Sequence, residues 1–403
     1  MDEETNMIIQ KLSVNGFKSM MSEQPIELGR VNCFIGANGV GKSNILEALG
    51  VIGAAAKGVV DDESLLRRGV RAGVPKLYKS SFASERTPAH IGISVTSSSA
   101  AEYRVSLLNP LESPDPAWSF KTEYLFDGSE EIIADGVRAK KNLNPTAGLA
   151  ALRQVELSKE NHGYQLMQSL KDYAIYCPNT PTLRGIAQDL QSRTPVGLSG
   201  GLLAEAFEML RKYLIQLGDV GEDVLDEVYS LIDWVADINI TSQAGSLLSD
   251  KVPRAKHLIK FTDRYMKTSR NELTAYDASE GALYVLFAAV LCLLPQSPKV
   301  FAIDNLDQAL NPRLLAKLTG KLSNWLKVGG NEKQILFTAH NPAVLDGLDL
   351  SSNDIRLFAV ERNSNGLTQI RRITLTPELQ LLNKDYPLSR LWLMGHLGAV
   401  PNV

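Results

Sequence analysis

The feature that most constrains the fold of this chain is a glycine-rich segment near its start, GANGVGKS at residues 36–43. An apolar run precedes it at 31–35, and apolar residues follow it at helical spacing over 44–52. A strand, a loop and a helix in this order are the context that the pattern GxxxxGK[ST] requires. Glycines let successive backbone N–H groups face one anion, and the helix start adds its positive dipole end. The segment therefore predicts a phosphate-binding loop; a glycine-rich turn with a chance lysine is the alternative.

Two residues of this loop have separate expected roles. We expect the Lys42 ammonium to reach the β- and γ-phosphates of a nucleotide, and the Ser43 hydroxyl to hold a magnesium ion. The full set expected to bind the nucleotide is Gly36, Asn38, Gly39, Gly41, Lys42, Ser43 and Asn44.

Composition and charge set broad limits. With 403 residues the chain is long enough for one large domain or two modest ones. Its 44% hydrophobic and 22% charged residues are typical of a soluble globular protein. The formal net charge of -3 gives no general attraction to nucleic acid, so such a contact requires a local basic patch.

The cysteines and the apolar stretches indicate a location inside the cell. Cys33, Cys177 and Cys292 are scattered and lack metal-ligand spacing, which fits a reducing compartment. No apolar stretch reaches the roughly 18 residues of a membrane span, and the acidic residues 1–4 are unlike a secretory signal. We therefore expect a cytoplasmic protein with no membrane partner.

The apolar pattern divides the chain into three parts. We expect an N-terminal lobe with the phosphate-binding loop and an antiparallel β element over 1–127, a mainly helical insertion over 128–250, and a C-terminal lobe over 251–403. The polar residues 128–165 indicate no clear element. The expected strands are 7–14, 31–35, 91–95, 103–107, 120–124, 300–303 and 334–338, with a turn at 16–19, and the expected helices are 44–52, 202–217, 224–234, 282–294 and 313–326.

A second motif lies at 300–305, where four apolar residues are followed by Asp304 and Asn305. The apolar run is typical of a buried parallel strand, which delivers Asp304 to the carboxyl edge where open α/β sheets bind ligands. There the carboxylate can hold magnesium through water. Nucleotidases with this arrangement generally carry Glu next, and losing a general base removes about 10² to 10⁴ in rate. Asn305 therefore predicts slow hydrolysis. Asp307 either substitutes for the missing base, if the turn brings it inward, or is a solvated turn residue.

Four segments resemble the ABC-type ATPase heads of the RecF, SMC and OLD kind. VNGFKS at 14–19 and GANGVGKSN at 36–44 are similar to the opening motifs of those heads. ASEG at 278–281 stands just before the second motif, where the family has its signature, and TAHNP at 338–342 ends the next strand, where the family has its switch histidine. The resemblance covers the first quarter and the last third of the chain.

This resemblance implies an α/β fold: a P-loop ABC-type ATPase head with a mixed sheet, an antiparallel β subdomain and a helical insertion. We expect no coiled-coil arms, because no heptad run in the sequence is long enough for a coiled coil. It implies ATP and Mg²⁺ as cofactors, with Ser43 and Asp304 holding the metal. The switch histidine that it implies, His340, joins the residues singled out above in an expected catalytic set of Asp304, Asn305, Asp307 and His340.

The resemblance also gives Ser279 and Gly281 a role across a subunit interface. In such heads this segment meets the γ-phosphate bound by the partner, which implies a homodimer or a higher even-numbered oligomer. Ser279 at a helix start offers a hydroxyl and Gly281 an unobstructed N–H. A plain helix cap is the alternative for Ser279, and a capped strand end is the alternative for His340. LSGG at 198–201 is more similar to the signature of ABC transporters than the segment at Ser279 is, but we interpret it as a turn and a helix start.

Two weaker signals concern partners. A basic stretch over 251–270 either follows a nucleic-acid backbone or is the solvated side of a strand or loop. The apolar residues of 388–403 either dock on the head or bind another protein. The cations of the basic stretch are Lys251, Arg254, Lys256, Lys260, Arg264, Lys267 and Arg270.

Together these features predict an ABC-type ATPase that dimerises around ATP and hydrolyses it slowly. Because no second catalytic set is visible, we expect effector chemistry from a separately encoded nuclease or toxin-like protein. By analogy with compact heads of this type, the leading hypothesis is a sensor or regulator in a bacterial anti-phage defence system. A RecF-like DNA repair ATPase and a non-hydrolysing ATP-dependent scaffold are the alternatives.

Overall fold

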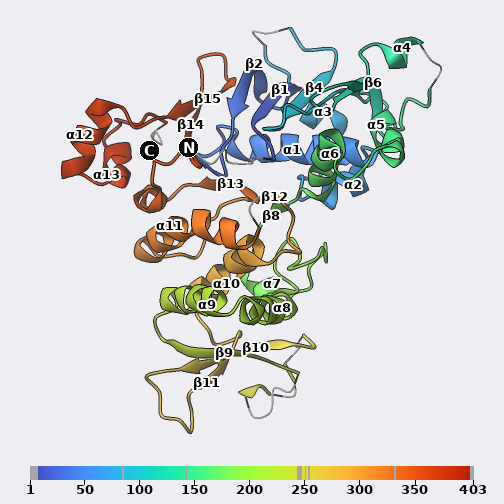
Figure 1. Cartoon of the computed structure of the whole chain (residues 1–403). Helices are drawn as coiled ribbons and strands as arrows, with labels where there is room; N and C mark the ends of the chain where they lie inside the picture. Colours follow the sequence, from blue (N-terminus) through green and yellow to red (C-terminus); the bar gives the residue numbers. More distant parts are fainter. Residues whose placement is uncertain are drawn as a thin grey trace.

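The chain forms two six-stranded sheets and a three-stranded sheet, with helices between and around them (Figure 1). The two large sheets lie toward one end of the molecule and the small sheet lies at the other (Figure 1). The computed structural model describes residues 8–83, 86–140, 143–242, 247–249, 251–252, 255–330 and 333–399.

The core sheet carries the phosphate-binding loop. Its strand order is β15-β14-β3-β13-β12-β8, and all neighbours are parallel except β14 and β15. β3, β12 and β13 are buried along their whole length, because both faces of the sheet are covered. The strands are β3 Val31–Ile35, β8 Ile175–Tyr176, β12 Val300–Ile303, β13 Gln334–Ala339, β14 Ile355–Arg362 and β15 Thr368–Ile373.

The second large sheet is antiparallel throughout, in the order β2-β1-β4-β5-β6-β7. Alternate residues of β4 are buried, which is the pattern of a sheet that packs on the core with one face. The strands are β1 Lys11–Phe17, β2 Met20–Glu27, β4 Ile91–Thr96, β5 Glu102–Leu108, β6 Ser119–Phe126 and β7 Glu131–Ile133.

Helix α1, Lys42–Lys57, lies between the two large sheets. Nearly all of its residues are buried, and they share one apolar cluster with Ile93 of β4 and Phe34 of β3. Gly53 lets α6 approach closely, because a Cβ there would lie 2.5 Å from the Leu170 carbonyl oxygen. The phosphate-binding loop therefore leads into a helix that is fixed on two sides.

Helices of the C-terminal half cover the opposite face of the core sheet. α10, Glu280–Leu293, is buried on all sides from Ala282 onward, because α8, α9 and α11 surround it. The small sheet, in the order β11-β10-β9, lies beyond α8 and α9 (Figure 1). These elements are α8 Leu203–Gln216, α9 Asp219–Leu231, α11 Pro312–Val328, β9 Val235–Thr241, β10 Leu258–Asp263 and β11 Glu272–Thr274.

The longest described helix is α11 with 17 residues, so the described part of the chain contains no coiled-coil arm. Within those same residues, every helix is too short or too polar to span a bilayer. The remaining helices are α2 Asp62–Leu66, α3 Pro75–Tyr78, α4 Val137–Lys140, α5 Leu149–Arg153, η1 Gln154–Glu156, α6 His162–Asp172, α7 Thr180–Leu183, η3 Pro342–Gly347, α12 Pro377–Asp385 and α13 Leu388–Leu393.

Most expected elements are present, with shifted ends. The strand expected at 7–14 runs from Lys11 to Phe17, so the turn begins at Lys18, which has a φ of 49°. Between 128 and 165, where no element was expected, the structure has β7, α4, α5, η1 and the start of α6. β8 lies within the residues expected to form the insertion, but it pairs with β12 of the core sheet. The expected domain boundary at residue 250 lies between β9 and β10, which pair in one sheet.

Gln334, at the start of β13, joins distant parts of the chain inside the core, and its loss should destabilise the fold. Its side chain accepts from Ile9 N at 3.1 Å and donates to the Ile9 and Gly29 oxygens at 2.7 Å each. Gln334→Leu leaves these buried groups unpaired, so we expect the free energy of unfolding in urea to fall by about 3 kcal/mol. Gln380→Leu on the exposed side of α12 is the control, with an expected change below about 0.5 kcal/mol. Equal stability of the two variants would contradict this role.

Candidate nucleotide-binding site

The loop between β3 and α1 has the backbone geometry of an anion cradle. Gly36 and Gly41 have φ angles of 149° and 111°, which L side chains rarely adopt. A Cβ would lie 2.1 Å from the Val360 oxygen at Gly36 and 2.3 Å from Thr368 Oγ1 at Gly41. No side chain caps the start of α1, so the first N–H groups of the helix face the loop without a side-chain acceptor.

The Lys42 ammonium lies inside this loop. Its Nζ donates to the Gly36 and Ala37 oxygens at 2.8 Å each, and it lies 3.4 Å from His340 Nδ1. Burial lowers the pKa of Lys42 to about 8, and the charges of nearby carboxylates partly oppose that shift. The lysine is therefore held where bound phosphates would replace carbonyl oxygens as its partners.

Asp304 lies at the carboxyl end of β12, beside the phosphate-binding loop. Its Oδ1 accepts from Ser43 Oγ at 3.0 Å and from Thr338 Oγ1 at 2.5 Å. β12 and β13 are adjacent and parallel, so the residues that follow them reach the same sheet edge. The two expected metal-holding residues, Ser43 and Asp304, are thus in direct contact.

These two oxygens fit a magnesium ion that is shared with a nucleotide. Hydroxyl and carboxylate oxygens are the hard ligands that Mg²⁺ prefers, and Mg²⁺ commonly takes its other ligands from phosphates and water. In the described part of the chain, no group of three or more His, Cys, Asp or Glu side chains could hold a metal. The protein residues alone would supply only part of the coordination shell.

Asn305 follows Asp304 in a left-handed conformation, with a φ of 58°. Asn tolerates this conformation better than most L residues. The Asn305 N–H donates to Thr338 Oγ1 at 2.8 Å, so one hydroxyl bonds both the Asp304 carboxylate and the next backbone group. Thr338, which sequence reasoning did not assign to the site, therefore fixes both positions.

The turn after Asn305 brings Asp307 inward. Asp307 Oδ2 accepts from the backbone N–H groups of His340 and Asn341 at 2.9 and 2.6 Å. Its Oδ1 is buried and has no hydrogen-bond partner among the described residues. Burial and the Lys42 charge lower the pKa of His340, which favours the neutral form of its imidazole. The structure thus places Asp304, Asn305, Asp307 and His340 together.

Ser279 and Gly281 lie at the start of α10. Ser279 is exposed, and its hydroxyl caps no backbone N–H of the helix. A Cβ at Gly281 would lie 3.4 Å from the Ala309 oxygen and 3.2 Å from Leu314 Cδ2. The segment therefore packs on the end of the turn that begins at Asp304, and it leaves the Ser279 hydroxyl available to a second molecule.

The LSGG segment at 198–201 has a different environment. The N–H groups of Ser199 and Gly201 donate to Asp189 Oδ2 at 2.8 and 3.2 Å. These N–H groups have an internal acceptor, and the segment leads into α8 as a turn before a helix.

A buried charge cluster supports the first turns of α1, and only part of it was visible in the sequence. Glu47 has an exposed fraction of 2% and pairs with Lys18 and with Arg71, whose Nε lies 2.6 Å from Glu47 Oε1. Arg71 also donates to Asn44 Oδ1 at 3.1 Å. Lys18 belongs to the GFKS motif. The other sequence feature that pointed to this cluster was Glu47, a single carboxylate within the apolar part of the expected helix. The cluster gives the motif a physical role, which is to bind the β1–β2 turn to α1.

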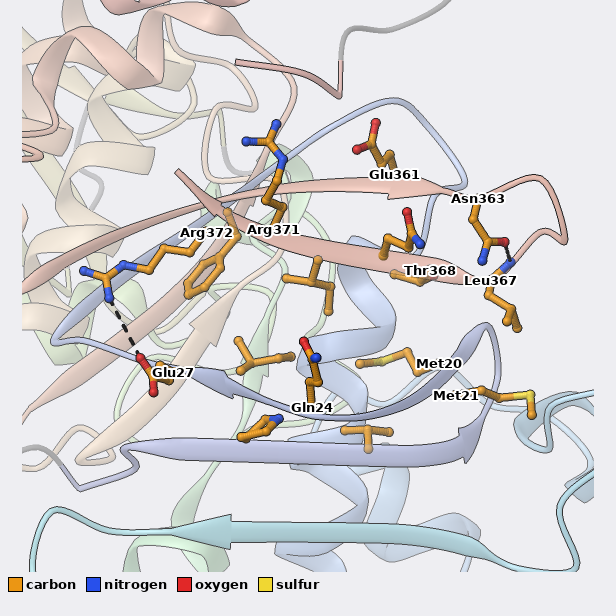
Figure 2. Close-up of a pocket in the computed structure, with 16 residues that line it drawn as sticks. Met20, Met21, Gln24, Glu27, Glu361, Asn363, Leu367, Thr368, Arg371 and Arg372 are labelled. Atoms are coloured by element: carbon orange, nitrogen blue, oxygen red, sulfur yellow. Dashed lines mark hydrogen bonds and ion pairs between the residues drawn. The ribbon is translucent and has the colours of Figure 1, made fainter. Parts of the chain in front are cut away.

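A groove lies between β2 and β15, the facing edges of the two large sheets, as Figure 2 shows. Thr368 at one end of β15 donates to the Val40 oxygen at 2.7 Å and lies 2.6 Å from Ser19 Oγ, so this end adjoins the phosphate-binding loop. An ion pair between Arg372 and Glu27 at 4.0 Å lies at the other end (Figure 2). The groove was not expected from the sequence, because it depends on how the two sheets meet.

The basic stretch lies mainly on and around β10, in the small sheet. Lys260 pairs with Glu272 of β11 at 2.6 Å, and Arg264 donates to the Val235 oxygen. Lys256 and Lys267 are exposed, whereas Arg254 lies outside the described residues. The small sheet is distant from the phosphate-binding loop (Figure 1).

The C-terminal segment docks on the head. Leu391, Trp392 and Leu397 are buried in the same apolar cluster as α10 and α11, and α13 packs on η3. Trp392 Nε1 donates to the Gly398 oxygen at 3.0 Å. Of the two alternatives left open by the sequence, docking is therefore observed for the described part, and residues 400–403 lie outside it.

The fold and the site define a P-loop ATPase of the ABC head class. Residues 31–346 match the sequence model of the family described as "AAA domain, putative AbiEii toxin, Type IV TA system". Because this match spans more than half of the chain, the chain belongs to that family.

Solved structures have a similar fold. The chain is similar to the SmcHead bound to the C-winged helix domain of ScpA, with a TM-score of 0.51 and 14% identity over 92% of this chain and 99% of that one. It is also similar to the Smc head domain with an extended coiled coil from Pyrococcus furiosus, with a TM-score of 0.52 and 11% identity over 94% and 99%. These similarities confirm the expected α/β head fold with its mixed and antiparallel sheets.

The match to a curated protein is local. The DNA replication and repair protein RecF of Parabacteroides distasonis is 44% identical over 43 residues, which are 11% of this chain and 12% of RecF. The chain therefore matches a small part of that relative's length, and the relative's activity does not transfer with the match.

The lowered pKa of Lys42 predicts that nucleotide binding takes up protons. At pH 8 about half of the free protein carries a neutral Lys42, and bound phosphates favour the ammonium, so about half a proton should enter per ATP bound. The affinity should be constant well below pH 8 and fall by up to about tenfold per pH unit above it. Calorimetry in buffers of different ionisation enthalpy measures the uptake. Lys42→Arg, which stays charged, is the control, and equal uptake by both proteins would contradict the assignment.

Proposed function

We propose that this chain is an ATPase that dimerises around ATP and hydrolyses it slowly, and that it acts as a sensor or regulator. The observation that carries the proposal is the convergence of Ser43, Asp304, Thr338 and His340 on the phosphate-binding loop. Together with Lys42, these residues supply a cation for the phosphates, oxygens for Mg²⁺ and an imidazole at the end of the adjacent strand. ATP and Mg²⁺ are the proposed cofactors.

The dimer follows from the position of the signature segment. Ser279 is exposed at the start of α10, and no hydrogen bond joins it to residues 36–43 in the described part of the chain. A hydroxyl and an unobstructed N–H at a helix start bind anions well. A second copy related by twofold symmetry would bring its Ser279 to this chain's nucleotide and receive the same contact in return. ATP would then be buried between two heads.

The residues beside Asp304 support the proposal of slow hydrolysis. The Asn305 amide can orient a water molecule but cannot accept its proton. Among the residues that the structure describes, one oxygen of Asp307 has no hydrogen-bond partner, while the other accepts from the backbone N–H groups of His340 and Asn341. In this proposal Asp307 positions the His340 segment, and the ATP-bound dimer persists because no carboxylate occupies the position of Asn305.

The biological role that we propose is bacterial anti-phage defence with a separately encoded nuclease or toxin-like effector. The family description, which names a putative AbiEii toxin and a type IV toxin–antitoxin system, supports this proposed role in defence. The proposed defence role implies a protein partner, the effector. The exposed cations near β10 are a candidate contact for nucleic acid.

A RecF-like DNA repair ATPase is the second candidate, supported by the local match to RecF. Tight, salt-sensitive binding of naked DNA by the purified chain would favour it over the defence role. A non-hydrolysing scaffold is excluded if the wild type hydrolyses ATP and Lys42→Ala abolishes that activity.

The proposed interface predicts that Ser279→Arg prevents ATP-dependent dimerisation. A bulky cation at the start of α10 occupies the position where a γ-phosphate and the facing subunit must fit. Light scattering of wild type should show a dimer with a non-hydrolysable ATP analogue and Mg²⁺, and a monomer for Ser279→Arg. Ser230→Arg, at an exposed position of α9, is the control and should dimerise as wild type does. A dimer of normal stability in Ser279→Arg would rule out this interface.

The proposed cause of slow turnover predicts that Asn305→Glu raises the ATPase rate. A carboxylate at this position can accept the proton of the attacking water, and a general base contributes about 10² to 10⁴ in rate. The left-handed backbone opposes Glu by roughly 1 kcal/mol, so the gain should lie near the lower end of that range. Asn305→Gln has the same length without the base and should not gain activity. Similar rates for both variants would show that residue 305 does not face the water.

A further inference from the structure

A basic hollow lies beside the C-terminal end of α1, opposite the phosphate-binding loop. It has a volume of about 520 Å³, which is within the usual range of small-molecule sites. A helix of 16 residues is about 24 Å long, so the hollow and the loop are separate sites at the two ends of α1. The charged residues that line the hollow are Lys57, Arg67, Arg68, Lys171, Arg193 and Asp172.

In the described part of the chain, main-chain carbonyls and not carboxylates bind two guanidinium groups of this hollow. Arg68, with an exposed fraction of 2%, donates to the Ser64 and Lys171 oxygens at 2.8 and 2.9 Å. Arg193 donates to the Asp172 oxygen at 2.5 Å and also to the Lys171 oxygen at 3.5 Å. The two cations thus meet at one carbonyl group. Burial, together with the Arg193 charge, lowers the pKa of Arg68 to about 10.

Nearby acids and helix ends neutralise only part of this charge. The hollow holds five cations and Asp172, and Arg67 pairs with Glu63 at 2.5 Å. The C-terminal ends of α1 and α6 each add about half a negative charge. The remaining excess is about two positive charges by this estimate. A terminal phosphate group carries roughly -1.5 to -2 at pH 7 and matches this excess better than a singly charged phosphodiester does.

We propose that this hollow binds a terminal phosphate group, as a phosphate monoester or a diphosphate. A second hollow of about 520 Å³ shares Gln168, Asp172 and Arg193 with the first and is also lined by Tyr164, which provides room for the organic part of a ligand. Free nucleotides and the 5′ ends of nucleic acids both carry such a group. The inference does not depend on the function proposed above, because it uses no residue of the phosphate-binding loop.

The test measures binding of inorganic pyrophosphate by calorimetry to the full chain carrying Lys42→Ala, which weakens binding at the loop. We expect one bound pyrophosphate per chain. Adding Lys57→Glu and Arg67→Glu, both at exposed side chains, should weaken this binding by about tenfold or more. Adding Lys317→Glu and Lys384→Glu, at exposed positions of α11 and α12, changes the net charge equally and should leave the affinity unchanged. Absence of binding, or equal affinity in the two charge-reversed proteins, would overturn the proposal.

A short single-stranded oligonucleotide, with and without a 5′-phosphate, distinguishes the two sources of the group. Tighter binding of the phosphorylated form, lost with Lys57→Glu and Arg67→Glu, identifies a nucleic-acid end. Binding of pyrophosphate but of neither oligonucleotide identifies a free small molecule. Equal binding of both oligonucleotides, with an equal loss in the charge-reversed protein, would show recognition of the phosphodiester backbone and would also overturn the proposal.

Discussion

The site depends on a single buried helix between two sheets. Because nearly every residue of α1 is packed, the helix cannot slide or rotate without opening cavities on two sides. Its first turn is therefore fixed at the carboxyl edge of the core sheet, where β12 and β13 also end. The one carboxylate inside it, Glu47, is tolerated because Lys18 and Arg71 neutralise it, and breaking that arrangement would leave an uncompensated charge in the core.

The chemistry at this edge is assembled from residues that are far apart in the chain. Parallel strands that are buried on both faces must be joined by long connections, and here those connections include whole helices and a sheet. Ser43, Asp304 and Thr338 consequently come from three different segments and meet through side-chain hydrogen bonds. Apart from the contiguous phosphate-binding loop, the candidate site therefore depends on the order of strands in the core sheet.

The arrangement of the candidate site residues agrees with the sequence prediction more closely than the elements around them do. The loop at 36–43 was recognisable because its pattern of glycines between a strand and a helix has few other physical explanations. Asp304 was recognisable because an apolar run that ends in a carboxylate is typical of a buried strand leading to a ligand site. The role of Thr338 was not visible, because a hydroxyl in an apolar strand becomes informative only when the neighbouring strand is known. The two-residue strand β8 was too short to show alternation, and α6 was hidden in a polar segment whose buried face is narrow. Asp307 was ambiguous because its environment depends on the left-handed residues Asn305 and Ala309 in the same turn.

The position of His340 has a mechanical consequence. Directly after it, Asn341 caps η3, and Asp346 of η3 accepts from the Ser389 N–H and hydroxyl at 2.9 and 2.7 Å. α13 is therefore joined by hydrogen bonds to η3, the short helix that follows His340. A displacement of His340 would therefore be transmitted through η3 to α13, which lies at the periphery of the molecule (Figure 1).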